Sequence, residues 1–188
     1  MRVKTVRNIL LVLLAFVLAA CSSSQQAPAD SFVKTTAPGF TLDDALGGQT
    51  SLSDYSGTPV LLFFHMAVGC SPCMQQIVDL QNSSKFQALN VQVISIARDS
   101  VAEMAPEAQT LGISSVPVLS DPDLAVSADY DVLQWAIDNG EPSHTFVLVD
   151  ADGQIVWVKD YGAPDNPDRT MYVEVDELID FVEANLEN

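Results

Sequence analysis

Two cysteines separated by two residues directly follow an apolar stretch of the chain. They are Cys70 and Cys73, in the segment FFHMAVGCSPCMQQ (residues 63–76). This spacing can hold a metal ion, close a small structural disulfide, or place a reactive thiol beside the thiol that resolves it. A structural zinc site needs about four ligands, and the further soft ligands are His65 and His144, with no second paired motif. A structural disulfide closing so short a loop constrains the unfolded chain little. The pattern therefore favours a redox-active pair.

The elements around the pair predict where it lies. Residues 59–64 (PVLLFF) and 91–97 (VQVISIA) are short continuous apolar runs, typical of buried central strands. Residues 71–89 between them have apolar side chains at helical spacing and a polar Asn-Ser-Ser stretch. Strand, helix and strand in this order predict a βαβ unit with two parallel strands joined right-handedly.

Cys70 falls where the first predicted strand has ended and the helix begins. A helix N-terminus has partial positive charge and free N–H groups, which favour a thiolate and lower the pKa of a thiol placed there. Pro72 fits the first helical turn, where its missing N–H is not needed. Cys73 comes one turn later and faces back towards Cys70. We therefore expect Cys70 to attack a partner disulfide and Cys73 to resolve the mixed disulfide.

The chain begins with a segment typical of export. Residues 1–20 have a basic start and an apolar run too short for a comfortable membrane span, as in a signal peptide. The run ends in Leu-Ala-Ala-Cys (residues 18–21), which resembles the lipobox of bacterial lipoproteins. The resemblance implies cleavage before Cys21 and lipid attachment to its sulfur. An ordinary secretory signal with a cysteine there by chance is the alternative.

Domain organisation and charge follow from this reading. Residues 21–35 are expected to be a lipidated flexible tether, and residues 36–188 one folded domain. Three of the eight basic residues lie in the signal, so the mature chain has five basic and 25 acidic residues, a formal charge of −20. This charge excludes nucleic-acid binding. It also opposes adsorption to an anionic membrane surface, so the lipid must hold the protein there. The predicted location is extracytoplasmic, where disulfides persist.

The rest of the chain completes an α/β pattern. A central sheet with helices on both faces is the natural architecture for this order of elements. Before the first apolar run we expect a short hairpin or edge strand at 40–57. After the second run we expect a helix at 100–112 with a break near Pro106, and then an extended piece and a weakly helical stretch at 116–138. The chain should end with an antiparallel hairpin at 144–162 around Asp-Ala-Asp-Gly and a closing amphipathic helix at 174–188.

Residues 37–73, from APGFTLDD to GCSPC, resemble the start of the thioredoxin-like redoxin superfamily. That superfamily includes the peroxiredoxins of the alkyl hydroperoxide reductase and thiol-specific antioxidant type, and membrane-tethered thiol-disulfide oxidoreductases. The similarity continues through residues 118–132 and 142–162. It implies a thioredoxin-like fold, with a central mixed β-sheet flanked by helices, an N-terminal hairpin and a mid-chain insertion. It also implies that Cys70 is the nucleophile and Cys73 the second cysteine, with no cofactor.

The chain departs from each branch of that superfamily. Typical peroxiredoxins have Pro and then Thr or Ser seven and three residues before the peroxidatic cysteine, and Phe63 and Ala67 stand there in this chain. The hydroxyl that would hold a peroxide is therefore missing. The thioredoxin branch usually has Trp just before its first cysteine, where this chain has Gly69. The cysteine pair itself favours disulfide exchange.

The resemblance also implies a cis-proline against the cysteine pair. Pro142 is the better candidate, and Pro117 is the rival, with an ordinary role at a strand edge as its simpler interpretation. His144 follows Pro142 closely and is either a proton carrier for the thiols or a surface residue at a strand start. His65 ends the first predicted strand and is interpreted first as a packed or exposed polar residue.

Two further residue types need an interpretation. Met66, Met74 and Met171 beside two cysteines suggest copper(I), but helical spacing makes Met74 a core residue first, and we predict no metal. Arg98 and Arg169 match no peroxide-binding motif, so solvated salt bridges are the default.

Three functions follow from these observations. The first is a tethered thiol-disulfide oxidoreductase acting on protein disulfides or dithiols, reset by an external thiol electron donor. The second is a thiol-dependent peroxidase on the same scaffold, in which Cys70 is oxidised to a sulfenic acid and Cys73 condenses with it. The third is a non-enzymatic lipoprotein that binds a metal or a partner.

Overall fold

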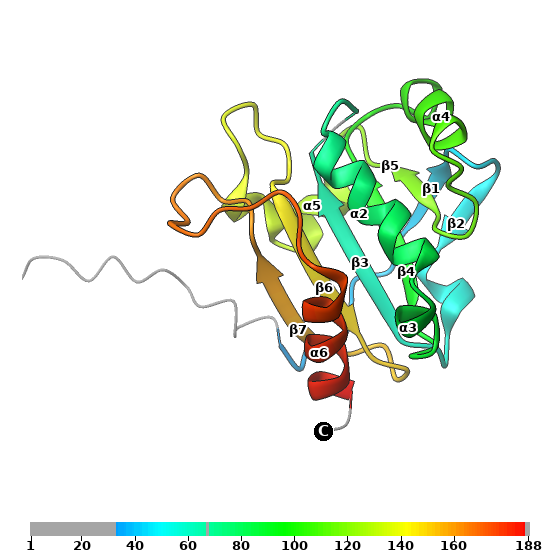
Figure 1. Ribbon diagram of the computed structural model, residues 1–188, viewed down its shortest axis with the longest axis vertical. Coiled ribbons are helices and arrows are strands. Elements are labelled where there is room, and N and C mark those ends of the chain that lie inside the picture. Colours follow the sequence, from blue (N-terminus) through cyan, green and yellow to red (C-terminus); the bar gives the residue numbers. More distant parts are fainter. Residues whose placement is uncertain (1–32, 67, 187–188) are drawn as a thin grey trace, which may run out of the picture.

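A seven-stranded mixed sheet forms the centre of the molecule, in the order β2-β1-β5-β4-β3-β6-β7 (Figure 1). The computed structural model describes residues 33–66 and 68–186. The expected signal peptide, Cys21, most of the tether and Ala67 lie outside these residues. The strands are β1 (Thr41–Asp44), β2 (Gln49–Ser51), β3 (Val60–His65), β4 (Gln92–Ala97), β5 (Val118–Ser120), β6 (His144–Val149) and β7 (Ile155–Asp160).

The two apolar runs form the central strands of this sheet. β3 and β4 are parallel, with Leu62 opposite Ile94, and helix α2 (Ser71–Asn82) joins them, which confirms the predicted βαβ unit. β6 pairs antiparallel with β3 on its other side and with β7 beyond. The expected hairpins are both present, since β1 also pairs antiparallel with β2.

Helices cover both faces of the sheet. The remaining helices are α3 (Ser84–Gln87), α4 (Val101–Thr110), α5 (Ala125–Asp129) and α6 (Val175–Leu186), with short 3₁₀ turns η2 (Leu52–Tyr55) and η3 (Val132–Trp135). Side chains of α2, α4 and α6 pack on one face of the sheet, in a cluster with Leu61 and Phe63. Side chains of α5, η3 and the chain before β1 pack on the other face, against Leu62 and Phe64. Alternation along β3 thus builds two cores.

One local prediction is wrong. The sequence indicated a break near Pro106, but α4 runs through this residue and ends at Thr110. Pro106 lies on the exposed side of the helix, and its ring removes one hydrogen bond of the helix without ending it. The Thr110 hydroxyl also donates to the Pro106 carbonyl, at 2.7 Å, which supports the following turn. Within the described residues, no helix has both the length and the apolar character that crossing a bilayer requires.

The chain after β7 crosses closely over the start of β6. The Tyr161 N–H donates to the His144 carbonyl, and Thr170 N–H donates back to the Tyr161 carbonyl. A Cβ atom on Gly162 would lie 2.9 Å from the Cβ and the backbone nitrogen of His144, and 3.0 Å from the Met171 sulfur. Only a residue without a side chain fits between these groups.

Replacing Gly162 by alanine should therefore destabilise the fold. We expect Gly162→Ala to lower the free energy of unfolding by about 1–3 kcal/mol, because backbone and core atoms must shift to admit the methyl group. Urea unfolding of the chain from residue 22 onward, with the disulfide intact, measures this change.

Gly39→Ala is the matched control, since a Cβ there meets nothing within 4 Å. Its effect should stay within about 0.5 kcal/mol. Equal stabilities of the two variants would contradict the packing described for Gly162.

Candidate redox site

The cysteine pair lies at the N-terminus of α2, as the sequence predicts. Cys70 is the residue before the first helical residue, and Pro72 occupies the first turn. Cys70 and Cys73 are joined by a disulfide, with their Cα atoms 5.3 Å apart. The Met74 N–H donates to the Cys70 carbonyl, which begins the helical hydrogen bonding. The structure thus brings the two predicted sulfurs together at the positive end of the helix dipole.

The two sulfurs have different surroundings. Cys73 is fully buried among core side chains, whereas Cys70 is partly exposed at the surface. An incoming thiol or disulfide can reach Cys70 from solvent, while Cys73 is shielded by the fold. This asymmetry is compatible with the expected roles of Cys70 as nucleophile and Cys73 as resolving cysteine.

Three hydrogen bonds hold the loop that connects β3 to Cys70. The Met66 N–H donates to the Ser143 carbonyl at 3.2 Å, and the Met66 carbonyl accepts from the His65 ring at 2.5 Å. The Val68 N–H donates to the carboxylate of Asp99 at 2.5 Å. The loop is therefore attached to β6 on one side and to the end of β4 on the other.

His65 is a structural residue of this loop. Because a carbonyl can only accept, the contact with Met66 places the proton of the neutral ring on Nδ1, and Nε2 then accepts from the Ser95 hydroxyl at 2.8 Å. Burial lowers the pKa of His65 to about 4, against the opposing effect of the Met66 hydrogen bond. The structure favours the packed polar residue for His65.

His144 lies directly against the buried cysteine. Its Nδ1 atom is 3.9 Å from the Cys73 sulfur, and the ring has no exposed surface. Its Nε2 atom is buried without a hydrogen-bond partner among the described residues. Burial, and secondarily the neighbouring His65, lower the pKa of His144 to about 3. Of the two interpretations of His144, the surface residue is wrong, because the first position of β6 is covered by α2 and by the chain after β7.

Phe63 links the two histidines. Its ring stacks on His65 at 4.7 Å between centroids, meets His144 edge-on at 4.6 Å, and stacks on Phe146 at 4.5 Å. The position where peroxiredoxins have proline is thus occupied by a fully buried aromatic ring. Ala67, at the position of the missing hydroxyl, lies outside the described residues.

The implied cis-proline is not present. No described peptide bond is cis, so the bonds before Pro142 and Pro117 are both trans. The trans form is the lower-energy one unless the surroundings impose the other. Pro142 is buried two residues before His144. Pro117 precedes β5, and its carbonyl accepts from Ser95 N–H at 2.9 Å, which fits an ordinary strand-edge role.

The other candidates lie outside the chemistry. Met66, Met74 and Met171 belong to the apolar core around Cys73. Within residues 33–66 and 68–186, no group of three or more His, Cys, Asp or Glu side chains could hold a metal ion. Arg98 is exposed and forms an ion pair at 3.6 Å with Glu141, which is largely buried, and Arg169 is exposed.

Sequence reasoning missed Asp99 and Ser95. Ser95 lies in β4 and its hydroxyl meets His65, while Asp99 follows β4 and binds the loop before Cys70. Burial, followed by the nearby carboxylates Glu103 and Glu141, raises the pKa of Asp99 against the opposing Val68 hydrogen bond. The signal was available, because parallel strands end at the same edge of a sheet and β4 is the parallel neighbour of β3.

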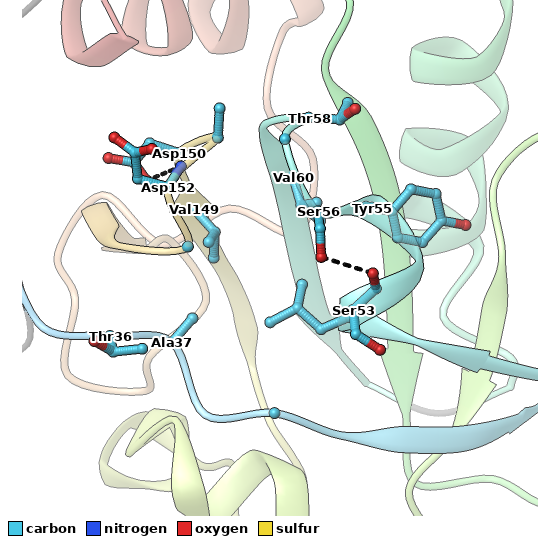
Figure 2. A pocket seen from close by; sticks show the side chains of 15 residues that line it. Thr36, Ala37, Ser53, Tyr55, Ser56, Thr58, Val60, Val149, Asp150 and Asp152 are labelled. Atoms are coloured by element: carbon cyan, nitrogen blue, oxygen red, sulfur yellow. Dashed lines mark hydrogen bonds between the residues drawn. The ribbon is translucent and has the colours of Figure 1, made fainter.

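A separate cavity of about 260 Å³ lies where β3 begins, at the opposite end of the strand from the cysteines (Figure 2). It is lined mainly by residues 36–39, 52–58 and 149–153 and contains neither a cysteine nor a histidine. Polar groups in it bond to one another, such as the Ser56 hydroxyl to the Ser53 carbonyl and the Asp152 N–H to the Asp150 carboxylate. It is distinct from the redox site.

The two buried histidines make stability depend on pH. The chain has two histidines, and the folded pKa of each lies below the unfolded value of 6.5. Below pH 6.5 the histidines of the unfolded chain bind protons, whereas those of the folded chain stay neutral. The free energy of unfolding is therefore highest above pH 6.5 and decreases as the pH falls towards 4. For the oxidised protein we expect urea unfolding to show about 2 kcal/mol less stability per histidine at pH 5 than at pH 7.

His144→Asn is the control for this titration. It should remove about half of the loss between pH 7 and pH 5, since one histidine remains. A free energy of unfolding that is the same at both pH values would show that the histidines are not held neutral by the fold.

Comparison with known proteins identifies the family of the chain. The sequence pattern of the AhpC/TSA family matches residues 33–158. A protein of Mycobacterium tuberculosis named as a candidate peroxiredoxin is 34% identical over 126 residues, covering 64% of this chain and 79% of that protein. The thiol-disulfide oxidoreductase ResA of Bacillus subtilis is 29% identical over 124 residues, covering 65% of this chain and 64% of ResA.

A solved structure shows the same fold. The crystal structure of the peroxidoxin BcpB from Mycobacterium tuberculosis superposes with a TM-score of 0.65 at 23% identity, covering 81% of this chain and 96% of that one. The family pattern covers well over half of the chain, and the relatives named above are thiol-based oxidoreductases. The chain is therefore an oxidoreductase of the AhpC/TSA family with a thioredoxin-like fold.

Proposed function

We propose that this protein is an extracytoplasmic, membrane-tethered thiol-disulfide oxidoreductase that works through Cys70 and Cys73. The observation that supports it best is the disulfide at the N-terminus of α2, with one sulfur at the surface and the other buried. A partner protein can reach the sulfur of Cys70, and the sulfur of Cys73 lies next to it, where it can displace the partner from Cys70.

Attack begins at the exposed sulfur. The N-terminal end of α2, a helix of 12 residues, favours the thiolate form of Cys70. The thiolate attacks a disulfide of a partner protein, forms a mixed disulfide with it, and expels one partner thiolate. The Cys73 thiolate then attacks the Cys70 sulfur, and the electron pair of the mixed disulfide leaves on the second partner sulfur. The partner is reduced by two electrons, and an external thiol donor supplies two electrons to reopen Cys70–Cys73.

A thiol peroxidase is the second candidate, because relatives of the chain are named as peroxiredoxins. In that reaction the Cys70 thiolate would attack a peroxide, releasing an alcohol or water and forming a sulfenic acid. The Cys73 thiol would then condense with it to give the disulfide and water. The aromatic ring of Phe63 and the methyl side chain of Ala67 provide no hydroxyl for the peroxide, so disulfide exchange is the better supported function.

The exchange reaction is directly testable. With dithiothreitol as donor, the chain from residue 22 onward should reduce insulin disulfides well above the rate of dithiothreitol alone. Cys70→Ser should abolish this activity, because the attacking sulfur is gone. Cys73→Ser should accumulate a mixed disulfide with insulin, visible on a non-reducing gel, because resolution is lost.

Peroxide consumption by the same preparations separates the two candidates. Fast turnover of hydrogen peroxide or an alkyl hydroperoxide, together with no insulin reduction, would overturn the proposal in favour of the peroxidase.

The tether has its own test. The full chain, expressed in a bacterium, should partition into the detergent phase of a Triton X-114 extract, and its N-terminal peptide should have the mass of lipid-modified Cys21. Cys21→Ser should move the protein to the aqueous phase with its insulin activity retained. Unmodified Cys21 in a protein cleaved elsewhere would show an ordinary secretory signal.

A further inference from the structure

One buried group next to the disulfide has no part in the exchange steps above. The ring of His144 is completely buried, and its Nδ1 atom is 3.9 Å from the sulfur of Cys73. Cys73 is itself completely buried. Apart from its bond to Cys70, the imidazole is the polar contact that the structure shows for this sulfur.

The surroundings of His144 keep its ring neutral. Phe63 and Phe146 meet it edge-on, and Gly162, in the chain after β7, lies against the Cβ and backbone nitrogen of the same residue. Two titratable groups face the ring of His144. His65, on β3, disfavours a positive charge on the ring, and Cys73 faces it from α2. No described carboxylate forms a hydrogen bond or an ion pair with the ring, which agrees with its lowered pKa. A neutral imidazole has one N–H.

The position of that single proton follows from the partners of the two nitrogens. With the proton on Nδ1, the N–H points at the Cys73 sulfur, and Nε2 is a buried acceptor without a partner. With the proton on Nε2, a buried N–H has no acceptor among the described residues. Orphaned buried N–H groups are rarer than under-satisfied acceptors. The first arrangement is therefore favoured, and it is the same tautomer as that of His65, whose Nε2 accepts from a hydroxyl.

We propose that His144 is a catalytic hydrogen-bond donor, whose neutral Nδ1–H stabilises the thiolate of Cys73. The proposal rests on the proposed exchange function and assigns a role to a further residue of the same site. When a thiolate of the donor attacks Cys70, the Cys70–Cys73 bond breaks and its electron pair passes to Cys73. The resulting thiolate is buried, where its charge is unfavourable unless a donor meets it. His144 provides that donor and gives up no proton.

This role differs from that of a general base. A base would have to take the proton of Cys73 and become a buried imidazolium beside the new thiolate, and burial and the neighbouring His65 both disfavour that cation. As a donor, the same ring lowers the pKa of the Cys73 thiol, so that more Cys73 is ready to attack the mixed disulfide. A hydrogen bond to a charged group contributes about 1.5–3 kcal/mol, so loss of the donor should slow resolution by roughly 10- to 100-fold.

Two variants at this position separate the possibilities. His144→Phe keeps an aromatic ring and removes the donor, whereas His144→Asn keeps an N–H donor near the position of Nδ1 and cannot act as a base at neutral pH. Each is made in the detergent-solubilised full chain carrying Cys70→Ser, and the Cys73 pKa is read from the ultraviolet absorbance of the thiolate. We expect the pKa of Cys73 to be clearly higher in His144→Phe than in the protein with His144. In His144→Asn, the pKa of Cys73 should stay close to its value in the protein with His144.

The same substitutions with both cysteines present test the reaction. The lifetime of the mixed disulfide should increase at least about tenfold in His144→Phe and much less in His144→Asn. Equal slowing in both variants would show a base and overturn the donor role. An unchanged Cys73 pKa in His144→Phe would show that the ring only fills space.

The native protein provides a measurement that does not depend on the variants folding. In the reduced protein, the nitrogen chemical shifts of the His144 imidazole should show a protonated Nδ1 and a bare Nε2. A proton on Nε2 would overturn the proposal. Because this measurement and the Cys73 pKa need no substrate, failure of insulin reduction in the native chain would count against the proposed function alone.

Discussion

The antiparallel pairing of β3 with β6 is the constraint on which the site depends. Its register places His65 opposite His144 and Phe63 opposite Phe146. Side chains alternate along a strand, so these four rings share the face that α2 covers. A slip of one residue would turn His144 to the other face, away from Cys73. The loop before Cys70 is attached to Ser143 at the same end, so the same pairing also holds the start of the helix.

A site built in this way has buried polar atoms in an apolar layer. His65 satisfies both of its ring nitrogens, with Met66 and Ser95, and the loop gains its anchor from them. His144 satisfies one nitrogen, with a sulfur atom. An unpaired buried polar atom costs about 1–3 kcal/mol, which the close packing of Phe63 and Phe146 around the ring helps to offset. Departures of this kind from a fully satisfied core are expected where a side chain serves function.

Much of the fold could be predicted from local patterns. The apolar runs of β3 and β4, the turn at Asp150 and the apolar face of α6 each correspond to an element of the structure. The break expected near Pro106 is absent, since α4 continues through this residue to Thr110. The cis-proline, taken from family resemblance, is absent, since the bonds before Pro142 and Pro117 are both trans.

The sequence by itself determined that a cysteine pair follows a buried strand at the start of a helix, and that the chain resembles redoxins. Both depend on residues close together in the chain, whose spacing sets their geometry. Only the tertiary structure decided that Cys73 is sealed from solvent, that Asp99 holds the loop before Cys70, and that His144 meets the buried sulfur. These contacts join residues 31 and 71 positions apart. They arise from the register of the strands and from the crossing of the chain at Gly162. Neither of these can be predicted from the spacing of residues that are close together in the sequence.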